Sequence, residues 1–182
     1  LKSFLELLNS NNIQYWVDSG TLLGLVRGGD ILPNDKDIDI GVHFNQLNKI
    51  NLLRTQIASL GYSIRTEFYN GDLFKYKLYP RIRGNKLLID LNIYRQNNNN
   101  YLWCPVTYFE KPKGYLFKKF QKIVKFFWRR VFTAIETNKF PYNRVKKNYT
   151  WVIPYKYYEN LIYNKEFLCY MFSNYKEYLK YR

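Results

Sequence analysis

The chain has 182 residues, a length that suits one domain with a sizeable core or one domain with a small appendage. No window reaches the roughly 18 to 20 uninterrupted apolar residues of a membrane-spanning helix, so the sequence predicts none. The net charge of +15 favours an anionic partner, either a nucleotide, a nucleic acid, a phospholipid surface or a phosphorylated glycan. Composition alone does not separate a nucleic-acid-binding protein from an enzyme that uses charged donors.

Apolar spacing and turn residues predict an alternation of helices and strands in the first part of the chain. Gly28 and Gly29 end a short helix, and Gly61 ends a longer amphipathic one. The helices are expected over 1–8, 21–27 and 45–60. The strands are expected over 13–17, 37–42, 62–69, 73–78, 86–94 and 101–106. A terminal strand over 151–154 and a helix to residue 180 close the domain.

The segment 115–132 predicts a helix with two different faces. One face carries large apolar residues: Leu116, Phe120, Ile123, Phe127 and Val131. Another carries basic residues: Lys118, Lys122, Lys125 and Arg129. Such a helix can lie on an anionic membrane, or it can pack its apolar face on the core and leave the basic face in water. The sequence leaves these two interpretations open.

The two cysteines, Cys104 and Cys169, lie far apart in the sequence among aromatic and aliphatic neighbours. Neither has the spacing of a metal ligand, so we expect buried thiols, as in a reducing compartment. One long-range disulfide is the alternative.

The strand 37–42 carries a dense acidic cluster, because Asp37 and Asp39 follow closely on Asp35. Side chains alternate along a strand, so Asp37 and Asp39 share one face and lie roughly 6.5 Å apart along the backbone. Two neighbouring carboxylates repel, and a bound cation is the simplest way to keep both ionised. We therefore predict a site for a hard cation, although an isolated Asp-x-Asp is more often a solvated strand end.

The strand 86–94 contributes a third acid, Asp90, flanked by apolar residues. A carboxylate in that setting needs a charged partner to offset its desolvation. If this strand lies beside the Asp37 strand, Asp90 completes a pocket of three carboxylates. The alternative is that Asp90 caps an edge or accepts a hydrogen bond from a backbone amide.

A turn of small residues, Ser19, Gly20 and Thr21, opens the helix that precedes the acidic cluster. The start of a helix offers free backbone N–H groups and a positive dipole end, which suit a donor phosphate. Arg27 could add a fork of donors to the same phosphate. His43, just beyond the acidic strand, is better explained as a surface or capping residue than as a general base.

The motifs SGTLLGLVR and ILPNDKDIDIGV, over residues 15–42, closely resemble the signature of the LicD/fukutin family of nucleotidyltransferase-fold enzymes. The likeness is weaker at LLIDLNIY, residues 87–94, and faint in the C-terminal WVIPYKYYENL. Asn34 stands where the family usually has Trp, which affects local packing but leaves the carboxylates intact. The chain is shorter than many members of that family, so the acceptor-binding region is expected to be reduced.

This resemblance implies an α+β fold, with a nucleotidyltransferase-like mixed sheet flanked by helices and a helical C-terminal part. The division expected is a catalytic core over 1–110 and a region 111–182 that completes the same domain. The resemblance also implies Mg²⁺, with Mn²⁺ as a substitute, held by Asp37, Asp39 and Asp90. Ser19, Gly20 and Thr21 would then face the donor phosphates, Arg27 would stabilise phosphate charge, and Asp90 would help to deprotonate the acceptor.

The activity implied is transfer of phosphocholine, ribitol phosphate or a similar phospho-substituent from a CDP-linked donor to a hydroxyl of a glycan or glycolipid. True nucleotidyl transfer and a catalytically silent basic module that binds nucleic acid or lipid are the competing hypotheses. We do not expect nucleic acid as the partner. The location expected is the cytoplasm, with residues 115–132 at an anionic membrane surface, or the Golgi lumen if the chain is a eukaryotic fragment.

Overall fold

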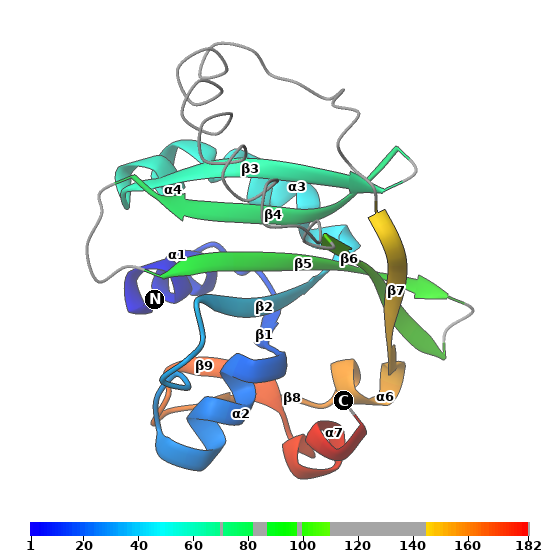
Figure 1. Cartoon of the computed structure of the whole chain (residues 1–182). Coiled ribbons are helices and arrows are strands. Elements are labelled where there is room, and N and C mark those ends of the chain that lie inside the picture. The colour runs from blue at the N-terminus through cyan, green and yellow to red at the C-terminus, as the bar shows by residue number, and fades with distance from the viewer. Residues whose placement is uncertain (70, 82–86, 98–99, 110–144, 182) are drawn as a thin grey trace, which may run out of the picture. The chain divides into compact units, whose positions relative to one another are not determined.

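The computed structural model describes residues 1–69, 71–81, 87–97, 100–109 and 145–181 (Figure 1). The chain divides into two compact units. One consists of Leu1–Pro105 together with Thr150–Arg182, and the other of Val106–Tyr149. The predicted division into a core over 1–110 and a region 111–182 that completes the same domain stays a prediction. The predicted helix over 115–132 lies outside the described residues.

The first unit is built on a mixed β-sheet with the strand order β1-β2-β5-β4-β3. The strands are β1 (Tyr15–Val17), β2 (Asp37–His43), β3 (Tyr62–Tyr69), β4 (Asp72–Pro80) and β5 (Leu88–Asn97). β2 and β5 are parallel, while β1 with β2, β5 with β4, and β4 with β3 are antiparallel. β6 (Tyr101–Phe109) pairs with β5, and β7 (Val145–Pro154) pairs with β6. These observations confirm the expected α+β fold with a mixed sheet.

The helices of the first part of the chain flank this sheet and are held by their apolar faces. They are α1 (Lys2–Ser10), α2 (Ser19–Gly28), the 3₁₀ turn η1 (Phe44–Gln46), α3 (Leu47–Leu52) and α4 (Arg54–Ser59). Gly29 ends α2 in the left-handed conformation at φ 72°, as its sequence position predicted. The single helix predicted over 45–60 is wrong: its backbone leaves the helical conformation at the buried residue Leu53, which packs into the core between α3 and α4.

The strand alternation of β2 and β5 separates an apolar face from a polar one. Each strand buries aliphatic side chains on one face: Ile38, Ile40, Val42, Ile89, Leu91 and Ile93. Their sequence neighbours alternate onto the other face: Asp37, Asp39, Gly41, Leu88, Asp90, Asn92 and Tyr94. Burial of the aliphatic set fixes the register, because a slip of one residue would place every carboxylate in the core.

The C-terminal part differs from the single aromatic helix that we expected. It consists of α6 (Tyr155–Glu159), a hairpin of β8 (Leu161–Asn164) and β9 (Cys169–Phe172), and α7 (Tyr175–Tyr181). Asn164 Oδ1 accepts a hydrogen bond from the backbone of Phe167, a local turn that ends β8 and competes with helix formation. In Figure 1 these elements and α2 lie at the β1 edge of the sheet.

Aromatic side chains of this C-terminal part pack against the face of the sheet that carries Gly41 and Tyr94. Trp16 of β1 is fully buried, and its ring contacts those of Tyr94, Tyr158 and Phe172. Trp16 lies opposite Gly41, and a methyl group at Gly41 would lie only 2.2 Å from the indole. Gly41 is therefore required by close packing rather than by backbone conformation.

The remaining global predictions concern the thiols and the membrane. Cys104 and Cys169 are both buried thiols outside any disulfide, as expected, and burial raises the pKa of Cys169 to about 11. Among the described helices, none is long and apolar enough to cross a membrane.

Candidate active site

The parallel pairing of β2 with β5 brings two acids from distant parts of the sequence together. Asp39 is the register partner of Asp90, and Asp37 is the partner of Leu88. Adjacent strands lie about 4.8 Å apart, so the side chains of Asp39 and Asp90 leave neighbouring points on the same face. The two acidic strands therefore lie side by side, which is the condition that the sequence set for Asp90 to join Asp37 and Asp39.

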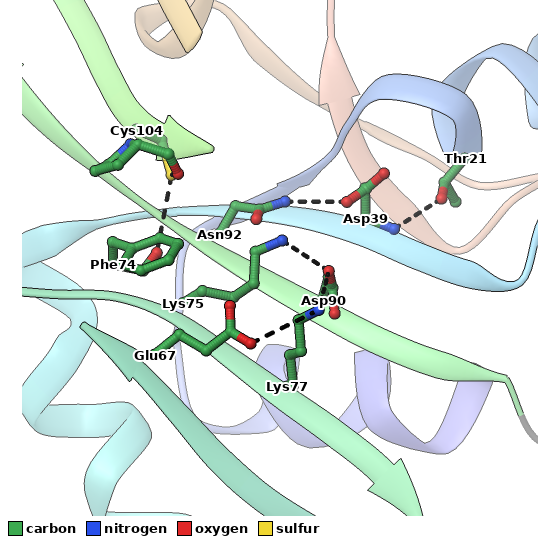
Figure 2. Close-up of polar contacts among 10 residues, drawn as sticks. Thr21, Asp39, Glu67, Phe74, Lys75, Lys77, Asp90, Asn92 and Cys104 are labelled. Carbon is green, nitrogen blue, oxygen red and sulfur yellow. Dashed lines mark hydrogen bonds and ion pairs between the residues drawn. The ribbon is translucent and has the colours of Figure 1, made fainter. Parts of the chain in front are cut away.

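Asp39 is the central carboxylate of this group, and both its backbone and its side chain are held (Figure 2). Its Oδ1 accepts a hydrogen bond of 3.1 Å from Asn92 Nδ2, and its backbone N–H donates to Thr21 Oγ1 at 2.8 Å. Burial and the nearby Asp18 carboxylate raise the pKa of Asp39 to about 7. The ionised form of Asp39 is thus disfavoured unless a cation lies beside it.

Asp37 lies two residues before Asp39 and is only partly buried. Burial is the largest cause that raises its pKa, and the Asp90 carboxylate adds to the effect, while Lys75 and Lys77 oppose it. For both Asp37 and Asp39, burial and a neighbouring carboxylate therefore raise the pKa. Both carboxylates would gain from a divalent cation on this face.

Asp90 is 3 % exposed and is paired with lysines of β4. Its Oδ2 accepts a hydrogen bond of 2.7 Å from Lys75 Nζ, and Lys77 Nζ lies 3.7 Å from the same oxygen. The sequence-based expectation of a charged partner for Asp90 is confirmed, since this partner is a lysine in the described structure. Asp90 Oδ1 is buried and has no hydrogen-bond partner among the described residues.

The N-terminus of α2 lies against β2 and is organised by Asp18. The Asp18 carboxylate accepts a 2.7 Å hydrogen bond from the Ser19 backbone, and the Asp18 N–H donates to the Asp39 carbonyl at 3.1 Å. Thr21 is buried, and its hydroxyl oxygen accepts the Asp39 N–H. A methyl group at Gly20 would lie 2.8 Å from Asp35 Oδ2, so this glycine lets the Asp35 carboxylate approach the first turn.

Asp18 is the main residue of this region that the sequence reasoning missed. It is fully buried, and it accepts hydrogen bonds from Tyr94 Oη at 2.6 Å and from Tyr178 Oη in α7. The available signal was local: an Asp directly before a predicted helix start is a preferred N-cap residue. No sequence pattern indicated that a tyrosine from the C-terminal helix would reach it.

Arg27 and His43 lie outside the carboxylate group. Arg27 is exposed in the last turn of α2, about 12 Å along the helix axis from Ser19, so the structure does not bring it to the first turn. His43 Nδ1 accepts a hydrogen bond of 3.3 Å from the Asn45 backbone and its ring stacks on Tyr158. His43 is a capping residue of η1, as the sequence favoured.

The donor set fits a hard divalent cation in its chemistry. Carboxylate oxygens are the ligands that such ions prefer, and Asp90 Oδ1 and Asn92 Oδ1 are buried oxygens without hydrogen-bond partners among the described residues. In the described part of the chain, however, no three acidic, His or Cys side chains are already arranged as a metal site. Asp39 is instead held by Asn92 and Asp90 by Lys75, so the carboxylates would have to converge as the cation binds.

Comparison with known protein families identifies the region that contains this group. Residues 12–132 match the sequence model described as "LicD/FKTN/FKRP, nucleotidyltransferase domain". An uncharacterized protein of Rickettsia prowazekii is 31 % identical over 117 residues, which cover 64 % of this chain and 40 % of that protein. The ribitol 5-phosphate transferase FKRP of Homo sapiens is 38 % identical over 48 residues, or 26 % of this chain and 10 % of that protein. The chain thus spans less than half the length of these relatives.

Similarity to solved structures is more distant. The lincosamide antibiotic adenylyltransferase LnuA with bound lincomycin is 14 % identical, with a TM-score of 0.47 over 99 % of this chain and 82 % of that chain. The enzyme ANT(2")-Ia in complex with adenylyl-2"-tobramycin is 17 % identical, with a TM-score of 0.37 over 52 % of this chain and 47 % of that chain.

Proposed function

Because the chain belongs to the LicD/FKTN/FKRP family, we propose that it is a magnesium-dependent transferase of phospho-substituents. The group moved is ribitol phosphate, phosphocholine or a similar unit, the donor is CDP-linked, and the acceptor is a hydroxyl of a glycan or glycolipid. The naming of the mammalian relatives as ribitol 5-phosphate transferases supports this class of reaction. The structural observation that carries the proposal is the pairing of Asp39 with Asp90 beside the N-terminus of α2.

Asp37, Asp39 and Asp90 are the residues that would hold Mg²⁺, or Mn²⁺ in its place. Bound there, the ion would neutralise phosphate charge and lower the pKa of the attacking hydroxyl. The raised pKa values of Asp37 and Asp39 support this assignment, because a cation between them would favour the ionised forms.

The first turn of α2 is the proposed contact for the donor phosphates. The amides of Gly20 and Thr21 have no acceptor among the described residues, and the positive end of the helix dipole lies there. Ser19 contributes its hydroxyl, which lies 3.4 Å from Asp18 Oδ1. Thr21 acts by holding the Asp39 backbone against this turn. Arg27 would have to act from the far end of α2, so it is the weakest member of the proposed set.

The transfer is an in-line displacement at the distal phosphorus of the donor. The acceptor oxygen forms a bond to that phosphorus, the bridging P–O bond breaks, and CMP leaves with the bonding electron pair. Asp90 Oδ1, which is buried and has no described hydrogen-bond partner, is the atom that takes the acceptor proton. The protein thereby positions the reactants and stabilises charge, which is the usual basis of phosphoryl transfer.

The acceptor-binding region is proposed to include the basic segment 115–132, at an anionic membrane surface. Its six lysines and arginines suit a phosphorylated or membrane-attached acceptor.

The proposal is tested by incubating the chain with Mg²⁺, glycan acceptors and a panel of CDP-linked donors, and by measuring CMP release. We expect release that stops when EDTA removes the metal. Asp37→Ala and Asp39→Ala are each expected to lower the rate by about 100-fold or more. Glu6→Ala is the matched control, since it removes an exposed carboxylate of α1.

Folded Asp37→Ala and Asp39→Ala variants that keep full turnover would show that the site is assigned wrongly. If no donor releases CMP, but the chain binds DNA at physiological salt, the silent basic module is the better description.

A further inference from the structure

Lys75 of β4 is a partly buried cation on the same sheet face as the carboxylates (Figure 2). It is the register partner of Asn92, and Lys77 is the partner of Asp90. Lys75 is 12 % exposed, and its Nζ donates to Asp90 Oδ2 at 2.7 Å. Lys75 therefore lies two strands from Asp39, on the side of the group opposite to α2.

Several acidic side chains, and not Asp90 alone, act on the charge of Lys75. Burial by itself would favour neutral Lys75, but Asp90 first and then Asp39 and Glu67 outweigh it and raise the pKa of Lys75. Lys75 in turn opposes the upward pKa shifts of Asp37 and Asp39. It is thus a fixed positive charge within the acidic group.

Stability alone does not account for this lysine. A buried ion pair roughly breaks even against apolar residues of similar volume, because desolvation of both charges offsets their attraction. The neighbouring β4 residues Phe74, Tyr76 and Leu78 are apolar and fill the core on the opposite face. A lysine inside the sheet, beside a candidate phosphate site, is better explained by the binding of an anionic ligand.

Lys75 also has unused hydrogen-bonding capacity. An ammonium group has three N–H donors. Among the described residues, Asp90 Oδ2 is the hydrogen-bond acceptor of Lys75. Two donors thus stay available for an anion while Asp90 holds the side chain in place.

We propose that Lys75 is a further catalytic residue, which contacts the distal phosphate of the donor, the one that is transferred. The proximal phosphate then lies at the first turn of α2, and the distal phosphate lies between Asp39 and Lys75. Lys75 Nζ donates to a non-bridging oxygen and offsets the negative charge on the group in transfer. This assignment rests on the proposed transfer from a CDP-linked donor.

The test compares the binding of CDP and CMP by calorimetry in the presence of Mg²⁺. CDP carries a distal phosphate and CMP does not, so their affinity ratio reports on contacts to that group. We expect the wild-type chain to prefer CDP. Lys75→Gln keeps a hydrogen-bond donor for Asp90 but removes the charge, and it is expected to weaken CDP binding about 10-fold or more, while CMP affinity changes less than about 3-fold.

Two further variants separate a direct contact from a loss of charge or of folding. Lys75→Arg is expected to retain most of the CDP preference. Lys77→Met removes the same charge two residues along the same face. Lys77 Nζ lies 3.7 Å from both Glu67 Oε1 and Asp90 Oδ2, beyond hydrogen-bond distance of Asp90, so this variant is expected to leave the CDP-to-CMP ratio within about 2-fold of wild type. Thermal unfolding of each variant verifies that it is folded.

The outcomes distinguish the two proposals. Two results would overturn the role of Lys75 while the proposed function stands, provided that wild type prefers CDP. In the first, Lys75→Gln weakens the affinities for CDP and CMP equally. In the second, Lys77→Met lowers the CDP-to-CMP affinity ratio as much as Lys75→Gln does. If Lys75→Gln does not fold, Lys75→Arg decides: a folded arginine variant without CDP preference also overturns it. If wild type binds neither nucleotide, the proposed function fails and the role of Lys75 fails with it.

Discussion

At the scale of single residues, Asp39 shows how one side chain serves structure and proposed chemistry together. Its backbone is hydrogen-bonded to Thr21 and Asp18, while its partly buried carboxylate accepts a hydrogen bond from Asn92. The pKa of Asp39, raised to about 7, means that the ionised carboxylate costs folding free energy in metal-free protein. That cost is absent below the ordinary pKa of an aspartate, grows as the pH rises toward 7, and persists above it.

Asp39→Asn should therefore stabilise the metal-free protein at high pH. The free energy of unfolding of the variant, minus that of wild type, should be near zero at pH 4 and about 1–3 kcal/mol at pH 8, because the amide keeps the Asn92 contact without the charge. Urea unfolding in EDTA across this pH range measures the difference. A difference that shrinks as the pH rises would contradict the assigned cause.

Gly41 gives a second prediction at this scale, because its hydrogen faces the buried Trp16 indole. Gly41→Ala should lower the free energy of unfolding by about 1–3 kcal/mol or more through overpacking. The control is Gly28→Ala, at an exposed helical position where a methyl group meets nothing within 4 Å. It should be neutral or slightly stabilising by urea denaturation, and equal losses in both variants would rule out the packing explanation.

At the scale of elements, the acidic site depends on a helix start, two parallel strands and a C-terminal helix. Alternation in β2 and β5 made it predictable that Asp39 and Asp90 share one sheet face, since burial of the aliphatic residues leaves the other face for the acids. Lys75 was not predictable, because a lysine that alternates with aromatic residues looks the same on a solvated face. The β8–β9 hairpin was missed because a short aromatic run fits either a helix or a strand.

The Asp18–Tyr178 hydrogen bond is the long-range link between these elements, and it joins α2 to α7. Tyr178→Phe should lower the free energy of unfolding by about 1–3 kcal/mol, because it removes a donor from a buried carboxylate. Tyr163→Phe is the matched control, since Tyr163 is 42 % exposed, and it should change stability by less than about 0.5 kcal/mol. Similar unfolding midpoints for the two variants would show that this link contributes little.

At the scale of the whole molecule, one unit joins Leu1–Pro105 with Thr150–Arg182, so residues from both ends of the sequence meet at Asp18. The sequence indicated the family and the acidic residues, because local motifs and the alternation of side chains along a strand are visible without the tertiary structure. They could not indicate the contribution of the C-terminal residues, which depends on tertiary packing of aromatic side chains such as Phe172 against Trp16. The net charge of +15 is the most marked feature of the composition, but it did not indicate the position of this acidic site.

We propose that the chain transfers a phospho-substituent rather than a nucleotide. Mass spectrometry of the acceptor, after incubation with Mg²⁺ and a CDP-linked donor, distinguishes the two reactions. We expect an acceptor heavier by the phospho-substituent of the donor, with CMP released in equal amount. An acceptor heavier by a cytidylyl group, or a product formed equally well by folded Asp39→Ala, would contradict it.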